Sequence, residues 1–133
     1  MMKGELTMSV RGIGGVFFKS KNHKALVKWY IENLGLKPDD EGYIYFLWSK
    51  LDQPGYTLWG LFPEDTNYFN PSESSWMINF VVSDIEEMVA NLKSRGVDVD
   101  EKGIQETPEG KFAWFMDPER NKIELWEPSD LHG

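Results

Sequence analysis

The sequence contains no cysteine, so disulfide bonds and thiol catalysis are excluded. Histidine is almost as scarce, with two residues in a chain of 133. His23 lies at the start of a predicted helix, and His132 is the penultimate residue of a polar tail. Neither position is typical of a metal ligand, and no Ser-His-Asp set can be assembled from them.

Positive charge and long apolar runs are scarce too. The 14 lysines and arginines are outnumbered by 22 acidic residues, which gives a net charge of −8. Nucleic acid and anionic membranes require a basic surface, so neither is an expected partner. No apolar run is long enough to span a bilayer, and residues 1–8 lack the apolar core of a signal peptide. We therefore expect a cytoplasmic protein.

The residues that are present predict a single domain over residues 1–133, built of two similar halves. A first module over residues 10–62 and a second over residues 76–128 are joined by a polar, proline-containing linker, residues 63–75. Each module is predicted to contain a strand, a helix that ends at a glycine, and further strands. The predicted elements are a strand over 13–19, a helix over 24–34 before Gly35, strands over 43–48 and 56–62, a strand over 76–82, a helix over 85–94 before Gly96, a short strand over 97–99 and a final hairpin.

Both predicted helices have an apolar stripe at helical spacing, which indicates that each packs one face against a sheet. The stripe residues are Leu26, Tyr30 and Leu34 in the first helix and Ile85, Met88, Val89 and Leu92 in the second.

The final hairpin holds the most informative residues of the chain. Residues 111–128 read KFAWFMDPERNKIELWEP, two apolar runs joined by turn-forming residues. In the second run Glu124 alternates with Ile123 and Leu125, so its side chain points to the opposite face, together with Lys122 and Trp126. A carboxylate among these apolar residues indicates either a functional group or a strand face that is simply solvated.

Three segments of the chain resemble the vicinal oxygen chelate superfamily, which includes glyoxalase I, bleomycin-resistance proteins and extradiol dioxygenases. They are residues 14–36, which contain GGVFFKS and LGL, residues 76–84, WMINFVVSD, and residues 117–128, DPERNKIELWEP. Relatives usually carry glycine where this chain has Arg120. We expect the turn to take its positive φ at Asn121 or to adopt another turn type.

The resemblance implies an α+β fold in which paired βαββ modules form a curled mixed sheet around a cleft, with the helices on the outer face. In metal-dependent relatives four positions supply the metal ligands, and they match Gly15, Trp59, Met77 and Glu124 here. Of these side chains, Glu124 alone suits the divalent ions that such sites hold, and even an open zinc site uses three protein ligands. We therefore predict no metal site and no other cofactor.

Strand alternation predicts which side chains line the cleft. The predicted ligand-binding residues are Phe17, Trp59, Met77, Asn79, Trp114, Glu124 and Trp126. An aromatic cavity with an amide and a carboxylate suits a small organic molecule that has an apolar or planar body and a cationic or hydrogen-bond-donating group. Alternatively, these aromatic side chains fill a sheet interface or a dimer contact.

Two functions are consistent with the sequence. The first is a metal-free binding protein of the bleomycin-resistance type that holds a small molecule. The second is an enzyme that resembles the lyases, isomerases or dioxygenases of the superfamily, with Glu124 as a catalytic base or as the remaining ligand of a rearranged metal site. In either case we expect a homodimer, because isolated βαββ halves expose sheet edges and apolar faces that pairing would cover.

Overall fold

The computed structural model describes residues 15–50 and 55–129. Its elements are α1 (His23–Leu34), the 3-10 turn η1 (Trp48–Lys50), β1 (Ile78–Val81), α2 (Ile85–Ser94), β2 (Asp98–Val99), β3 (Gln105–Thr107), β4 (Gly110–Met116) and β5 (Lys122–Pro128). Among these described residues, no helix is both long enough and apolar enough to cross a membrane.

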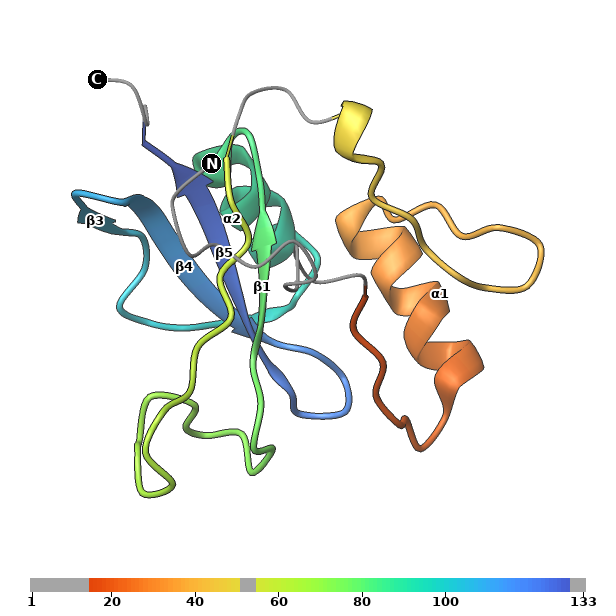
Figure 1. Cartoon of the computed structure of the whole chain (residues 1–133), viewed down its shortest axis with the longest axis horizontal. Helices are drawn as coiled ribbons and strands as arrows, with labels where there is room; N and C mark the ends of the chain where they lie inside the picture. Colours follow the sequence, from red (N-terminus) through yellow and green to blue (C-terminus); the bar gives the residue numbers. More distant parts are fainter. Residues whose placement is uncertain (1–14, 51–54, 130–133) are drawn as a thin grey trace, which may run out of the picture.

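The strands form one mixed sheet that curls without closing, and the fold is α+β as predicted (Figure 1). The strand order is β1-β5-β4-β2, with β3 also paired to β4. β1 runs parallel to β5, whereas the other pairs are antiparallel. The predicted hairpin is confirmed as β4 and β5, which pair along their whole length from Gly110↔Pro128 to Met116↔Lys122. This hairpin is the centre of the sheet.

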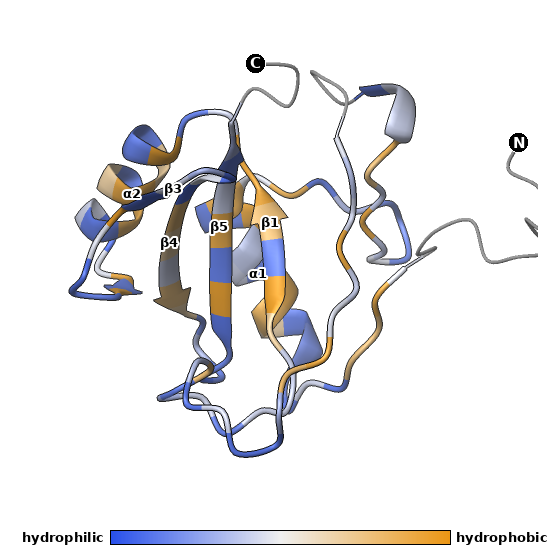
Figure 2. Ribbon diagram, turned by 60° about the vertical axis from the view of Figure 1, so that its left-hand side comes forward, coloured by the Kyte–Doolittle hydropathy of each residue, from blue (hydrophilic) through white to orange (hydrophobic). Residues whose placement is uncertain are grey.

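Both helices pack on the same face of the sheet, which agrees with the predicted apolar stripes (Figure 2). The buried core consists of Ile85, Val89 and Leu92 from α2, Ala113 and Phe115 from β4, and Ile123 and Leu125 from β5. From α1, Trp29 and Leu34 pack against this cluster, and the Trp29 ring lies 6.0 Å from that of Phe115. The opposite face of β4 and β5 carries the remaining, alternate side chains and faces away from the helices.

Both helices have capping interactions at their ends. The side chain of Asn22 accepts a hydrogen bond from Ala25 N at the start of α1, and the side chain of Asp84 accepts one from Glu87 N at the start of α2. Gly35 and Gly96, at the two C-terminal ends, have φ of 71° and 78°. This left-handed conformation is the one that glycine tolerates best, so both predicted stops are confirmed.

The strands predicted in the first half are wrong within the part of the chain that the structure describes. Residues 15–19, 43–48 and 56–62 contain no strand, and the extended structure there is limited to an isolated bridge between Pro38 and Ile44. Ile13 and Gly14 of the first predicted strand lie outside the described residues. These segments have the right residues for strands, but a strand also requires a hydrogen-bonding neighbour, which composition does not supply.

The turn between β4 and β5 also differs from the prediction, because its positive φ falls on Arg120, at 65°, and not on Asn121. Asn121 is held by Asp117: its backbone N–H donates to Asp117 Oδ1 and its Nδ2 to Asp117 Oδ2, both at 2.9 Å. With Asn121 fixed by these bonds, the preceding residue takes the left-handed conformation. Arg120 therefore carries a backbone strain that glycine at this position would not.

Candidate functional site

Three polar or aromatic side chains form a row across the sheet on the face away from the helices. Asn79 of β1 pairs with Glu124 of β5, and Trp114 of β4 pairs with Glu124 from the other side. Directly paired residues place their side chains on the same face, so the register alone brings the three together. Asn79, Trp114 and Glu124 are all residues that the sequence predicts as ligand-binding.

The Glu124 carboxylate is held by three hydrogen-bond donors. Asn79 Nδ2 donates to Oε1 at 2.8 Å, while Trp114 Nε1 and the Tyr68 hydroxyl donate to Oε2 at 2.9 and 2.5 Å. Glu124 is 9% exposed, so these donors replace most of the water that would otherwise solvate it. The carboxylate is thereby a fixed acceptor at the centre of the row.

Tyr68 comes from the linker and was not among the predicted site residues. Burial, followed by the hydrogen bond to Glu124, raises the pKa of the Tyr68 hydroxyl well above its usual range. At neutral pH it is therefore a neutral donor. The ring also meets the Trp114 ring of β4 edge to face, with centroids 6.2 Å apart, so the linker is attached to the sheet by both its polar and its apolar atoms.

Lys122 lies on the same face of β5, two residues before Glu124. Its ammonium group donates to the backbone oxygen of Tyr68 at 2.7 Å and lies 5.3 Å from the centre of the Tyr68 ring. Burial, followed by the nearby charge of Lys102, lowers the pKa of Lys122. The strand alternation predicts that Lys122 shares a face with Glu124, but its contact with the linker depends on tertiary structure.

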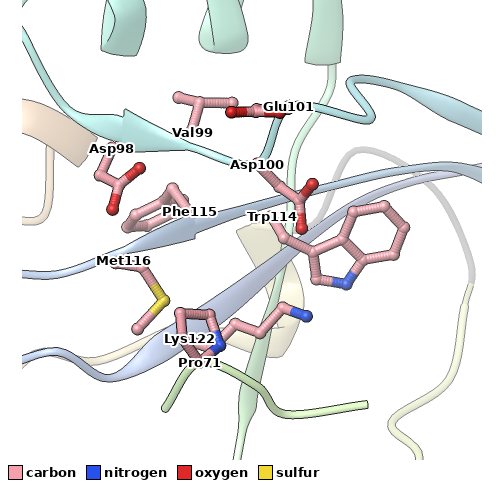
Figure 3. Close-up of a pocket in the computed structure, with 9 residues that line it drawn as sticks. All are labelled: Pro71, Asp98, Val99, Asp100, Glu101, Trp114, Phe115, Met116 and Lys122. Carbon is pink, nitrogen blue, oxygen red and sulfur yellow. The ribbon is translucent and has the colours of Figure 1, made fainter. Parts of the chain in front are cut away.

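A pocket of about 210 Å³ opens beside this row (Figure 3). It lies between β2 with the turn that follows it, the inner strands β4 and β5, and Pro71 of the linker. Trp114, Met116 and Lys122 contribute from the sheet, whereas Asp98 and Asp100 contribute from the edge. The pocket combines an indole wall, an ammonium group and carboxylates, which is a suitable lining for a small polar aromatic molecule.

The other predicted site residues lie in different surroundings. Trp126 is buried on the same face of β5, where it stacks on Phe112 and donates from Nε1 to the backbone oxygen of Glu109. Met77, which precedes β1, is half-buried. Phe17 and Trp59 are 85% and 74% exposed, so the folded chain by itself does not enclose them.

The donor set around Glu124 does not fit the metal site that is typical of metal-dependent relatives. The two N–H groups and the hydroxyl that point at its oxygens would point at a bound cation as well. In the described part of the chain, one group of three acidic side chains is close enough to share an ion, namely Asp84, Glu86 and Glu127. It lies at the start of α2, where Glu127 accepts from Ile85 N and Glu86 pairs with Lys111.

Comparisons with known proteins agree with this architecture. The chain is similar to an antibiotic-binding protein, TnmS3, from Streptomyces sp. CB03234, with 25% identity, a TM-score of 0.51 and coverage of 82% of this chain and 88% of that one. It is also similar to a glyoxalase/bleomycin resistance protein/dioxygenase domain from Frankia sp. EAN1pec, with 19% identity, a TM-score of 0.55 and coverage of 91% and 100%. The similarity to the Frankia domain shows a shared fold and nothing about function.

Among curated protein sequences, none matches the chain. The family model of the Glyoxalase/Bleomycin resistance protein/Dioxygenase superfamily, however, matches residues 13–125, which include α1, the whole β4–β5 turn and Glu124. The chain therefore belongs to the Glyoxalase/Bleomycin resistance protein/Dioxygenase superfamily.

Proposed function

We propose that the protein binds a small organic molecule with an aromatic or planar body on the sheet face around Glu124, without a metal ion or other cofactor. The observation that carries this proposal is the row Asn79–Glu124–Trp114, in which a fixed polar acceptor lies between an exposed amide and a large aromatic ring. The similarity to an antibiotic-binding protein of known structure supports a binding role.

Each member of the row has a different part in binding. Because Asn79 Nδ2 faces Glu124, the Oδ1 of the same exposed amide is the group that a hydrogen-bond donor or cation on the ligand would meet. The Trp114 indole is 5% exposed, and it supplies an aromatic wall where it lines the pocket beside the row. Glu124 fixes the orientation of both side chains and does not itself need to contact the ligand.

The same contacts weigh against Glu124 as a catalytic base. Three of the lone pairs of its carboxylate already accept hydrogen bonds, two on Oε2 and one on Oε1. A base must take a proton from the substrate at hydrogen-bond distance, which leaves a single position on Oε1 for that purpose. Binding is therefore the function that this geometry supports better.

We further propose that the protein forms a homodimer in which the first half of one chain covers apolar surface of another. Phe17, Trp48, Leu58, Trp59 and Leu61 are each more than 70% exposed. Apolar side chains gathered in this number on segments 16–18, 43–48 and 56–62 are typical of an interface. In such a dimer Phe17 and Trp59 would be buried. We therefore propose that the cleft predicted to contain them forms between two chains. Light scattering after gel filtration tests it, and a monomer at micromolar concentration would contradict it.

The binding function is tested by tryptophan fluorescence with a panel of aromatic antibiotics, aromatic amines and aromatic acids, in the presence of EDTA. We expect at least one compound to quench the emission, and Trp114→Phe to weaken its binding about fivefold, equivalent to about 1 kcal/mol of stacking. The matched control is Trp76→Phe, at a half-buried position before β1 that belongs neither to the row nor to the pocket. Equal loss in both variants, or no quenching by any compound, would contradict the proposal.

A further inference from the structure

Two lysines converge on the same pair of aromatic rings, and one of these rings, Trp114, lines the pocket. Lys102 Nζ lies 4.2 Å from the centre of the Trp114 ring and 6.0 Å from that of Tyr68. Lys122 Nζ lies 5.3 Å from the Tyr68 ring and 5.8 Å from the Trp114 ring. Two ammonium groups that share these rings repel each other, and an anion between them would remove that repulsion.

Lys122 is an unusual residue for this position, because it is 5% exposed and extends along the pocket toward Trp114 (Figure 3). Lysine is almost never fully buried unless it is paired. In the described part of the chain, its ammonium group makes one hydrogen bond, to the backbone oxygen of Tyr68. An ammonium group has three donors, so two remain for a ligand in the pocket.

We propose that this pocket binds the carboxylate of a small aromatic acid, with the carboxylate between Lys122 and Lys102 and the ring against Trp114 and Met116. The inference rests on the proposed binding function, because Trp114 belongs both to the row and to the pocket. It adds the charge of the ligand, which the row alone does not define. A pocket of about 210 Å³ is smaller than most drug-binding sites, which favours a ligand of one or two rings.

The edge of the pocket limits the charge that a ligand can carry. Asp98 is paired with Arg120 at 3.0 Å, and Asp100 accepts a hydrogen bond from Lys102 N through Oδ1. Asp100 and Glu101 therefore leave negative charge at the entrance, in a protein whose net charge is −8. A monoanion satisfies the two lysines, whereas a dianion such as an aryl phosphate would be repelled by the carboxylates.

Benzoate and its neutral analogue benzamide are suitable probes, because they differ chiefly in charge. We expect benzoate to shift the indole N–H resonance of Trp114 at millimolar concentration and to bind at least about tenfold more tightly than benzamide, as for hydrogen bonds to charged groups. Phenyl phosphate should bind more weakly than benzoate. Added salt should weaken the binding of benzoate and leave that of benzamide unchanged.

Variants at both lysines complete the test. Lys122→Met and Lys102→Met should each lower the affinity for benzoate about tenfold or more, while Lys111→Met, which removes another lysine of the same sheet, should not. Lys102 is exposed, so its variant keeps the test valid if Lys122→Met fails to fold.

Equal affinities for benzoate and benzamide, or benzoate binding that both variants retain, would overturn the anion site. The proposed binding function would stand if neutral aromatic compounds still bound at Trp114. If no aromatic compound of any charge bound to the protein, both proposals would fail.

Discussion

Trp114 Nε1 donates a hydrogen bond of 2.9 Å to Oε2 of Glu124 on the neighbouring strand. The same oxygen accepts a hydrogen bond from the Tyr68 hydroxyl, so a single atom joins β4, β5 and the linker. This contact explains why a carboxylate lies between the apolar residues Ile123 and Leu125 of β5. Glu124 orders the surrounding side chains, and any ligand on this face meets a surface that is already arranged.

The first prediction concerns the stability that this arrangement contributes. Glu124→Gln removes the charge and replaces one acceptor oxygen with an NH₂ group, so the hydrogen bonds to a buried carboxylate are weakened or lost. We expect the free energy of unfolding in urea to fall by about 1–3 kcal/mol. Glu106→Gln, on the exposed strand β3, is the matched control and should change it by no more than about 0.5 kcal/mol. An equal effect of the two substitutions would show that the donors around Glu124 do not stabilise the fold.

The second prediction concerns the attachment of α1 to the sheet. The Tyr30 hydroxyl donates to Oδ2 of Asp117, which is 2% exposed, at 2.9 Å. Tyr30→Phe removes this donor and leaves one buried acceptor with fewer partners, so we expect a loss of about 1–2 kcal/mol in the free energy of unfolding. Tyr43→Phe, at an exposed position, should be nearly neutral. A double-mutant cycle with Asp117→Asn should give a coupling energy above zero, and full additivity would exclude the contact.

Local sequence patterns predict the second half of the fold. α2 extends over residues 85–94 as expected, because its apolar stripe and the stop at Gly96 indicate the same bounds. The alternation of residues in the hairpin likewise predicts that Glu124 points away from Ile123 and Leu125. These features depend on neighbours in the sequence, and so they can be read from it.

Contacts between distant residues could not be predicted in the same way. Tyr68 meets Glu124 across 56 positions of the chain, and nothing in the linker sequence indicates which strand it crosses. The first-half segments have strand-like composition, yet the structure gives residues 43–48 and 56–62 no strand partner. The position of the strained turn residue also depended on a long-range network, because Asp117, which holds Asn121, is itself bound by Tyr30 of α1.

The third prediction uses that strained residue. Arg120→Gly should raise the free energy of unfolding by up to about 1 kcal/mol, because glycine adopts a φ of 65° without strain. The substitution also removes the ion pair between Arg120 and Asp98, but this pair is exposed and contributes little. Asp98→Asn removes the pair alone and serves as the control. If thermal unfolding shows that Arg120→Gly lowers stability by more than Asp98→Asn, the backbone strain is not relieved.

The fourth prediction concerns the two buried hydroxyls at high pH. Burial, followed by the charge of Asp117 for Tyr30 and by the hydrogen bond to Glu124 for Tyr68, raises both pKa values in the folded protein. A tyrosine in the unfolded chain has a pKa of about 10. Each hydroxyl therefore contributes stability that is complete below about pH 10 and is lost as the pH rises toward its raised pKa.

Titration of the unfolding free energy should reveal this loss as a steep decline above about pH 10 in the wild-type protein and a shallower one in Tyr30→Phe or Tyr68→Phe. Comparison with these variants is necessary because the pKa of Lys122 is lowered by burial, and this shift makes stability rise with pH, in the opposite direction. Between about pH 6 and 8 the phenols are protonated in both states, so the difference between wild type and variant should be constant there. Parallel curves above about pH 10 would mean that folding does not raise the pKa of either hydroxyl.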